Sequence, residues 1–399
     1  MNILLWRAWK PLYTEPATFS YLETHSIGGT CSQLLWHARN LVSMGHKVQV
    51  LGVARNDICE LEVEFVGANN KLDQEQIFES GRLNRPEIIL LEGGHASAAA
   101  LRKSYPEAFI VHVGQNIDRG GAANALKIER IVDLFAFVSP GSLSYYCMHS
   151  PALMHKFVLL RNVVPWERLY KDLNIGFIED KVVWVGAWTK KGLRAWAKTM
   201  ERIMVEFPSL KWELYGPSYG SHSGSEFPSY VFANLNLPWE RIYIRDYPMP
   251  KLAKALANAK VVIVSLGNET ACISALDAHA AGRPVISGND MIFKFNNPEG
   301  SGIRAVRSEE RHRALSFLLK NPDVCHSMGQ VGRAFIAEER TDANQRYDLA
   351  MILKYAKLKK SSRLTSGYRP LGKFEEHMSY FSDRIHRIWQ RIVRMGFGT

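Results

Sequence analysis

The sequence predicts an α/β protein built from two Rossmann-like domains with parallel sheets. Its 399 residues are enough for two cores of ordinary size. Short apolar runs alternate with segments long enough for a helix, which is the rhythm of a parallel sheet. This rhythm restarts after Asn162-Val163-Val164-Pro165. Hydrophobic residues make up 46% of the chain and charged residues 22%, as is typical of globular domains.

The first domain opens with a βαβ unit. Its helix ends at Gly45, a residue type that commonly terminates helices. We expect a strand over 2–6, a loop through 26–30 that contains Gly28 and Gly29, a helix over 32–44 and a buried strand over 48–53. Further strands are expected over 88–91, 109–113 and 134–138.

The second domain repeats the pattern. Strands are expected over 182–185, 210–215, 242–244, 261–265 and 284–287, and helices over 192–206 and 250–259 and around 277–281. A linker is expected near 160–168, where Pro165 interrupts strand pairing. The predicted limits are 1–165 for the first domain, 166–350 for the second and 351–399 for a basic helical segment.

The net charge of +11 is concentrated at the end of the chain. Residues 351–399 hold eleven Lys or Arg and three acids. From Tyr380 onward, apolar residues recur at helical spacing with arginines between them, which predicts an amphipathic helix. Two interpretations of residues 380–399 stay open: a helix on an anionic membrane surface, and a terminal helix packed on the two domains.

No segment resembles a signal peptide, and no apolar run has the length of a membrane-spanning helix. We therefore expect a cytoplasmic protein, with attachment to the inner face of a membrane as one option. Five cysteines lie far apart without a CxxC pair, so we expect buried thiols rather than a disulfide framework or a zinc site.

The segment from Ser265 to Val285 carries the strongest chemical pattern. A strand ends in a loop with Glu269, a helix follows, and a second acid, Asp277, lies eight residues further on. A loop acid can accept hydrogen bonds from sugar hydroxyls, and the backbone N–H groups of Thr270, Ala271, Cys272 and Ile273 can hold a phosphate at the helix N-terminus. Asp277 can reach a ribose diol.

These residues resemble the retaining GT-B glycosyltransferases of family 4. The family places an acid, seven residues, a second acid, then Ala, a Gly-x-Pro and Val. The matching residues are Glu269, Asp277, Ala278, Gly282, Pro284 and Val285, joined by Val185-Gly186, Lys191-Gly192, Tyr215-Gly216-Pro217, Gly28-Gly29 and Gly45-His46-Lys47-Val48. The resemblance extends over most of residues 20–350.

The resemblance implies a GT-B enzyme that moves a hexose from a UDP- or GDP-sugar to a saccharide, glycan or lipid-linked acceptor, with retention of configuration. Glu269 would bind the sugar and Asp277 the ribose. Lys191, Gly192, Gly216 and Pro217 would complete the donor site, and Gly28, Gly29, Gln115 and Asn116 would lie on the acceptor side. We expect neither a cofactor nor a metal, since the lysine and the helix N-terminus can replace a cation.

The chain departs from the family at several positions. Ala187 replaces an arginine, so Lys191, helped by Lys190, would supply most of the positive charge. Asp277 is shorter than the usual Glu, and Cys272 replaces a glycine. A first-domain histidine is replaced by Gln115-Asn116, so no catalytic histidine is assigned.

Several signals are less specific. A pair of loop glycines usually serves a turn, and His95 and His112 are expected to be structural. Glu92-Gly93-Gly94-His95 lies at the end of a strand and is a candidate for the acceptor site.

Three alternatives to transfer remain: a sugar-nucleotide epimerase or hydrolase, a binding-only protein, and a nucleic-acid-binding protein that uses the basic tail. Since no aromatic and basic residues interleave across a sheet face, no nucleic acid is expected.

Overall fold

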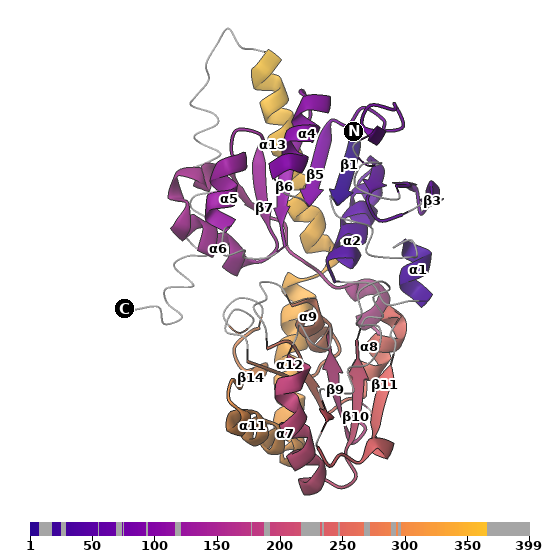
Figure 1. The fold of residues 1–399 in the computed structure, drawn as a ribbon, viewed down its shortest axis with the longest axis vertical. Helices are drawn as coiled ribbons and strands as arrows, with labels where there is room; N and C mark the ends of the chain where they lie inside the picture. The colour runs from indigo at the N-terminus through magenta and orange to yellow at the C-terminus, as the bar shows by residue number, and fades with distance from the viewer. Residues whose placement is uncertain are drawn as a thin grey trace.

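The computed structural model describes residues 1–7, 18–24, 29–54, 56–68, 74, 76–92, 95–115, 121–176, 178–186, 192–216, 232–233, 235–245, 248–266, 272–288, 293 and 297–364. Within these residues the chain forms two halves, each built on one mainly parallel sheet, stacked along the long axis of the molecule (Figure 1). The two predicted Rossmann-like units are therefore confirmed.

The described residues of the first half form an eight-stranded sheet, parallel except for an antiparallel hairpin at one edge. Across the sheet its strands are β3 (Ile58–Glu60), β4 (Val63–Val66), β2 (Lys47–Leu51), β1 (Asn2–Arg7), β5 (Ile88–Glu92), β6 (Phe109–Gly114), β7 (Leu134–Phe137) and β8 (Phe157–Leu159). Its helices are α1 (Phe19–Thr24), α2 (Gly29–Ser43), α4 (His95–Ser104), α5 (Gly121–Ile128), α6 (Pro140–His149), the short 3₁₀ helix η1 (Pro151–Lys156) and α13 (Asp342–Leu364).

The second half has a six-stranded parallel sheet in its described residues. Across the sheet its strands are β11 (Ile242–Arg245), β10 (Lys211–Tyr215), β9 (Lys181–Val185), β12 (Val261–Ile263), β13 (Val285–Ser287) and β14 (Gly302–Arg304). Its helices are the π-helix η2 (Trp166–Tyr170), α7 (Leu193–Glu206), the 3₁₀ helix η4 (Trp239–Arg241), α8 (Met249–Ala257), α9 (Ile273–Ala280), α11 (Ser308–Lys320) and α12 (Pro322–Glu339).

Strand β1 is buried on both faces of the first sheet. Ile3 and Leu5 belong to a core shared with helices α2 and α13, whereas Leu4 and Trp6 belong to a core shared with α4, α5 and α6. Successive side chains of a strand point to opposite faces, so burial of both faces requires an uninterrupted apolar run. This is why the first apolar run of the sequence forms a central strand.

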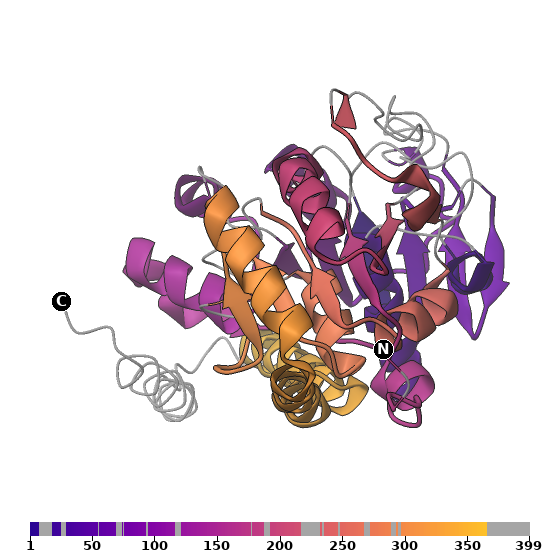
Figure 2. The same cartoon turned by 90° about the horizontal axis from the view of Figure 1, so that it is seen from below.

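Strand β9 has the same position in the second half. Val182 and Trp184 pack toward α7 and α11, while Val183 and Val185 pack toward α8 and α9. Figure 2 shows the helices on both faces of this sheet.

Two features of the first half differ from the sequence-based prediction. Helix α2 begins at Gly29 rather than at residue 32, and the Ser32 hydroxyl donates back to the Gly29 carbonyl oxygen at 2.8 Å, within the first helical turn. The β3–β4 hairpin was not predicted. Its turn residues, Leu61 and Glu62, have φ values of 49° and 62° but lack the Gly or Asn that usually identifies such turns.

The expectation of buried cysteines holds for Cys31, Cys272 and Cys325. It is wrong for Cys59, which is exposed because it lies on the edge strand β3, and Cys147 is only half-buried.

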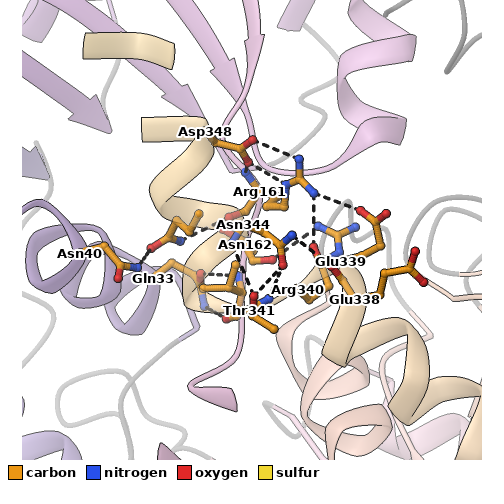
Figure 3. A network of polar contacts seen from close by, with 12 residues as sticks. Gln33, Asn40, Arg161, Asn162, Glu338, Glu339, Arg340, Thr341, Asn344 and Asp348 are labelled. Carbon is orange, nitrogen blue, oxygen red and sulfur yellow. Dashed lines mark hydrogen bonds and ion pairs between the residues drawn. The ribbon is translucent and has the colours of Figure 1, made fainter. Parts of the chain in front are cut away.

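The chain passes from the first half to the second after β8 and returns between α12 and α13 (Figure 1). Arg161, which follows β8, connects these two linking segments of the chain (Figure 3). Its Nε and Nη2 donate to Asp348 Oδ2 and Oδ1 at 2.7 and 3.1 Å, and its Nη1 lies 3.0 Å from Glu339 Oε2. Asp348 belongs to α13 and Glu339 ends α12, so one guanidinium fixes both linking segments.

Helix α2 also holds this junction. The Gln33 side-chain amide donates to the Val163 carbonyl oxygen at 2.8 Å and accepts from the Val163 N–H at 2.9 Å. Asn40 Nδ2 donates to Gln345 Oε1 at 2.7 Å. The first half is therefore assembled from two distant parts of the chain.

Within the described ranges, no helix is both long and apolar enough to cross a membrane. The predicted amphipathic helix at 380–399 lies outside the described residues. Helix α13 returns to the first half from Asp342 onward; the domain limits themselves remain a prediction.

Candidate active site

The carboxyl ends of β9 and β12 form the topological switch point of the second sheet. Strand β10 lies on one side of β9, and β12 lies on the other. Ligands of open α/β sheets bind in the crevice at such points. Gly192 follows β9 and Ile273 follows β12 in the chain, and Gly216 follows β10 at the same edge.

Three loops of this edge meet at Leu266. A Cβ atom on Gly192 would lie 3.0 Å from Leu266 Cβ, and one on Gly288 would lie 2.7 Å from Leu266 Cδ2. Gly192 is also the N-cap of α7, with a φ of 88° that favours glycine. Gly192 therefore lies beside the segment that leads to Glu269, and a larger residue at this position would require Leu266 to shift.

Helix α9 begins at Ile273, with Cys272 as its N-cap. The carbonyl oxygen of Cys272 accepts hydrogen bonds from the N–H groups of Ala275 and Leu276, at 3.0 and 3.2 Å. The N–H groups of Ile273 and Ser274 precede this first turn and have no intrahelical acceptor. These two groups, with the positive end of the helix dipole, are suited to an anion.

Asp277 lies within α9, and its carboxyl group is buried, with 3% of the residue exposed. Its Oδ1 accepts a hydrogen bond of 2.8 Å from the Tyr170 hydroxyl of η2. Burial raises the pKa of Asp277 to about 7, against the effect of that hydrogen bond. One carboxyl oxygen thus has a protein partner, and contact with a ribose remains a prediction.

The first sheet has its switch point between β1 and β5, with β2 on the other side of β1. The last residues of the two strands, Arg7 and Glu92, are paired in register. Glu92 is 6% exposed, and burial raises its pKa while the charge of Arg7 opposes the rise. A residue with a guanidinium group and one with a carboxyl group therefore end neighbouring strands at this edge of the sheet.

Two amides extend this pair along the carboxyl edge. Gln115 Nε2 donates to Glu92 Oε1 at 2.8 Å, and Asn162 Nδ2 donates to Gln115 Oε1 at 3.3 Å. Arg7 Nη1 contacts Cys31 Sγ at the start of α2. Gln115 was predicted on the acceptor side and Glu92 was a weaker candidate, whereas Arg7, Cys31 and Asn162 were missed.

One signal could have identified Arg7, because a charged residue directly follows the apolar run of the first strand. Asn162 gives no such signal, since its partner Gln115 lies 47 positions away. His112 packs edge-on against Phe135 with ring centroids 5.9 Å apart, as befits the structural role expected for it.

The two halves are in contact at the N-termini of α2 and α9. A Cβ atom on Gly29, the first residue of α2, would lie 3.0 Å from Ile273 Cγ1, at the first residue of α9. Gly29 and Ile273, predicted in different halves of the site, are therefore in contact.

The other predicted site residues lie outside the described residues: Gly28, Asn116, Lys191, Pro217, Glu269, Thr270 and Ala271. Among the described residues, no group of three or more His, Cys, Asp or Glu side chains could hold a metal ion.

No protein-family model and no curated protein sequence matches this chain. Solved structures do. Sucrose-phosphate synthase from Thermosynechococcus elongatus is similar with a TM-score of 0.67 and 16% identity, covering 91% of this chain and 100% of its own. HepE from Anabaena, in complex with UDP-glucose, has a TM-score of 0.64 and 12% identity, covering 89% and 99%. WaaG, a glycosyltransferase involved in lipopolysaccharide biosynthesis, has a TM-score of 0.61 and 11% identity, covering 88% and 99%.

These neighbours share the two stacked Rossmann-like units over nearly their whole length. The chain therefore has the GT-B fold, as its sequence resemblance implied. At identities of 11–16%, the likeness extends to the fold and no further.

Proposed function

We propose that this protein is a retaining glycosyltransferase that moves a hexose from a UDP- or GDP-sugar to a saccharide, glycan or lipid-linked acceptor. The observation that carries the proposal is the contact between Gly29 and Ile273. It brings the N-termini of α2 and α9 together, one from each half, and this arrangement suits a ligand with a diphosphate between two polar parts.

The donor would bind on the second half. The N–H groups of Ile273 and Ser274 would hold the diphosphate with Lys191, while Glu269 would bind the sugar hydroxyls and Asp277 the ribose. The fold shared with HepE, whose structure contains UDP-glucose, supports a nucleotide-sugar donor. The sequence resemblance to family 4 supports retention of configuration.

Thermal unfolding with a panel of UDP, GDP and their sugar conjugates tests the donor site. We expect one nucleotide family to raise the melting temperature, and Glu269→Ala and Asp277→Ala to reduce that rise. Lys47→Ala, an exposed residue of β2, is the control and should leave the rise unchanged. Absence of a rise at millimolar concentration with every nucleotide would refute the proposal.

We also propose that transfer needs no metal, because a lysine and a helix N-terminus can neutralise a leaving diphosphate. Transfer should then survive EDTA.

The basic tail supports a place on the cytoplasmic face of an anionic membrane. Loss of sedimentation with phosphatidylglycerol vesicles after removal of residues 380–399 would support it, and retained sedimentation would contradict it.

A second candidate function is a sugar-nucleotide epimerase or hydrolase, or a binding-only protein. The hydrogen bond from Tyr170 to the short, buried Asp277 favours it, because that carboxyl group is already engaged. Nucleotide-induced stabilisation together with no transfer to any saccharide would support this alternative.

A further inference from the structure

Glu92 fixes the direction of a chain of side-chain hydrogen bonds at the carboxyl edge of the first sheet. An ionised carboxylate only accepts, so Gln115 presents its NH₂ group to Glu92 and its oxygen to the NH₂ group of Asn162. This leaves Asn162 Oδ1 as the end of the chain. The orientation of both amides follows from one carboxyl group.

Asn162 is only 2% exposed, so its side-chain oxygen is shielded from solvent. That oxygen, Oδ1, accepts no hydrogen bond from any described residue. Among the described residues, Gln115 alone donates a hydrogen bond to Glu92. Buried oxygens without a donor are costly to leave unsatisfied. Asn162 Oδ1 therefore lacks a donor, and the Glu92 carboxylate has capacity to accept further hydrogen bonds. A ligand that donates hydrogen bonds, as a hydroxyl group does, would suit both.

The charges at this edge narrow the class of ligand. Arg7 and Glu92 end neighbouring strands in register and carry opposite charges. The two charges together are close to neutral, so they give a phosphate or carboxylate ligand little net attraction. A phosphate would also bring additional acceptors to a place that already has acceptors in excess.

We propose that the Glu92 carboxyl group binds a hydroxyl group of the acceptor, and that this acceptor is a neutral saccharide rather than a sugar phosphate or a sugar acid. Gln115 and Asn162 are positioning residues that hold Glu92 in place. The role as acceptor rests on the proposed function; the preference for neutral sugars rests on the crevice alone.

Saturation-transfer NMR can test this without a donor. The probes are methyl α-D-glucopyranoside and methyl α-D-mannopyranoside, with glucose 6-phosphate and glucuronate as charged counterparts. We expect at least one neutral glycoside to bind the wild type more tightly than either charged sugar. Glu92→Gln, which keeps the shape, should weaken that binding about tenfold, as expected for loss of a hydrogen bond to a charged group.

Glu64→Gln is the matched control. Glu64 lies in β4 of the same half and accepts from a glutamine amide, Gln49 Nε2, at 2.9 Å, so the substitution removes the charge from an equivalent hydrogen bond at a distance from Glu92. It should leave glycoside binding unchanged. Gln115→Met, which releases Glu92 while keeping the volume, should weaken binding by a smaller factor, about fivefold.

Equal glycoside binding by Glu92→Gln and the wild type would overturn the proposal. So would wild-type protein that binds no neutral glycoside, or that binds a charged sugar more tightly. Thermal unfolding of each variant verifies its fold. Nucleotide-induced stabilisation needs no acceptor, so it reports on the proposed function separately.

Discussion

The two switch points are built from different kinds of residue. In the first half the strand ends carry Arg7 and Glu92, and side chains provide the polar groups. In the second half Gly192 packs on Leu266, and the backbone at the start of α9 provides the polar groups. A site made of side chains depends on charge, whereas a site made of backbone groups depends on the path of its loops. The two halves should therefore respond differently to the same substitution.

The largest effect is expected for Gly52→Ala, which acts on the first crevice. Gly52 has a φ of 93°, and a Cβ there would collide with the carbonyl oxygen of Arg7. Left-handed strain and overpacking together should lower the free energy of unfolding by about 3 kcal/mol, measured by urea denaturation. Nucleotide-induced stabilisation should keep its size, because the second half is untouched.

Gly45→Ala separates the two causes. Gly45 has a φ of 80° with no atom within 4 Å of the added Cβ, so only the backbone strain remains. Its cost should be about 1 kcal/mol. Equal costs for the two variants would show that the contact with Arg7 is unimportant.

The next effect concerns pH and Asp277. Its pKa of about 7 in the folded protein exceeds the ordinary 3.8, so the folded state keeps a proton that the unfolded chain has lost. The stability linked to this proton is complete below about pH 4 and is lost as the pH rises to 7. Relative to Asp277→Asn, the wild type should weaken by on the order of 2–3 kcal/mol between about pH 5 and pH 8.

Urea denaturation of both proteins at the two pH values measures this difference. The same measurement on Glu92→Gln extends the comparison to the first half, because burial also raises the pKa of Glu92, although Arg7 opposes the rise. In both halves the wild type should lose stability relative to the variant as the pH rises. Parallel stability curves for Asp277→Asn and the wild type would mean that Asp277 ionises normally.

Gly192→Ala is expected to change stability less than Gly52→Ala does. The φ of 88° costs the new side chain about 1–2 kcal/mol, and Leu266 has to shift away from the added methyl group. Because that shift moves the loop that leads to Glu269, nucleotide-induced stabilisation should fall. Gly300→Ala is the control, with a φ of 80° and no atom within 4 Å. An equal fall in nucleotide-induced stabilisation for Gly192→Ala and Gly300→Ala would show that the contact with Leu266 is unimportant. It would also contradict the view that the second site depends on the path of its loops.

The start of α7 could be predicted from the sequence, because its cause is local. Gly192, the left-handed N-cap of α7, is a residue type that favours this conformation, and the helical pattern follows it directly. Strands β1 and β9 were equally easy to predict. A strand buried on both faces has an uninterrupted apolar run in place of alternating apolar and polar residues.

Contacts between distant residues could not be predicted. Tyr170 lies 107 positions from Asp277 and Asn162 lies 47 positions from Gln115, so both hydrogen bonds depend on how the finished units pack. The sequence placed Asp277 correctly on a helix but gave no indication that a tyrosine would bind its carboxyl group.

Helix α13 has a consequence for the order of folding during synthesis. The second half, from η2 to α12, is one continuous stretch, whereas the first core contains Leu349, Ile352 and Leu353 of α13. A ribosome delivers that helix only after the whole second half has emerged. We therefore expect the half that is made first to reach its native packing last, and pulse proteolysis of nascent chains that stop at residue 341 should find the second half protected and the first half still open to cleavage.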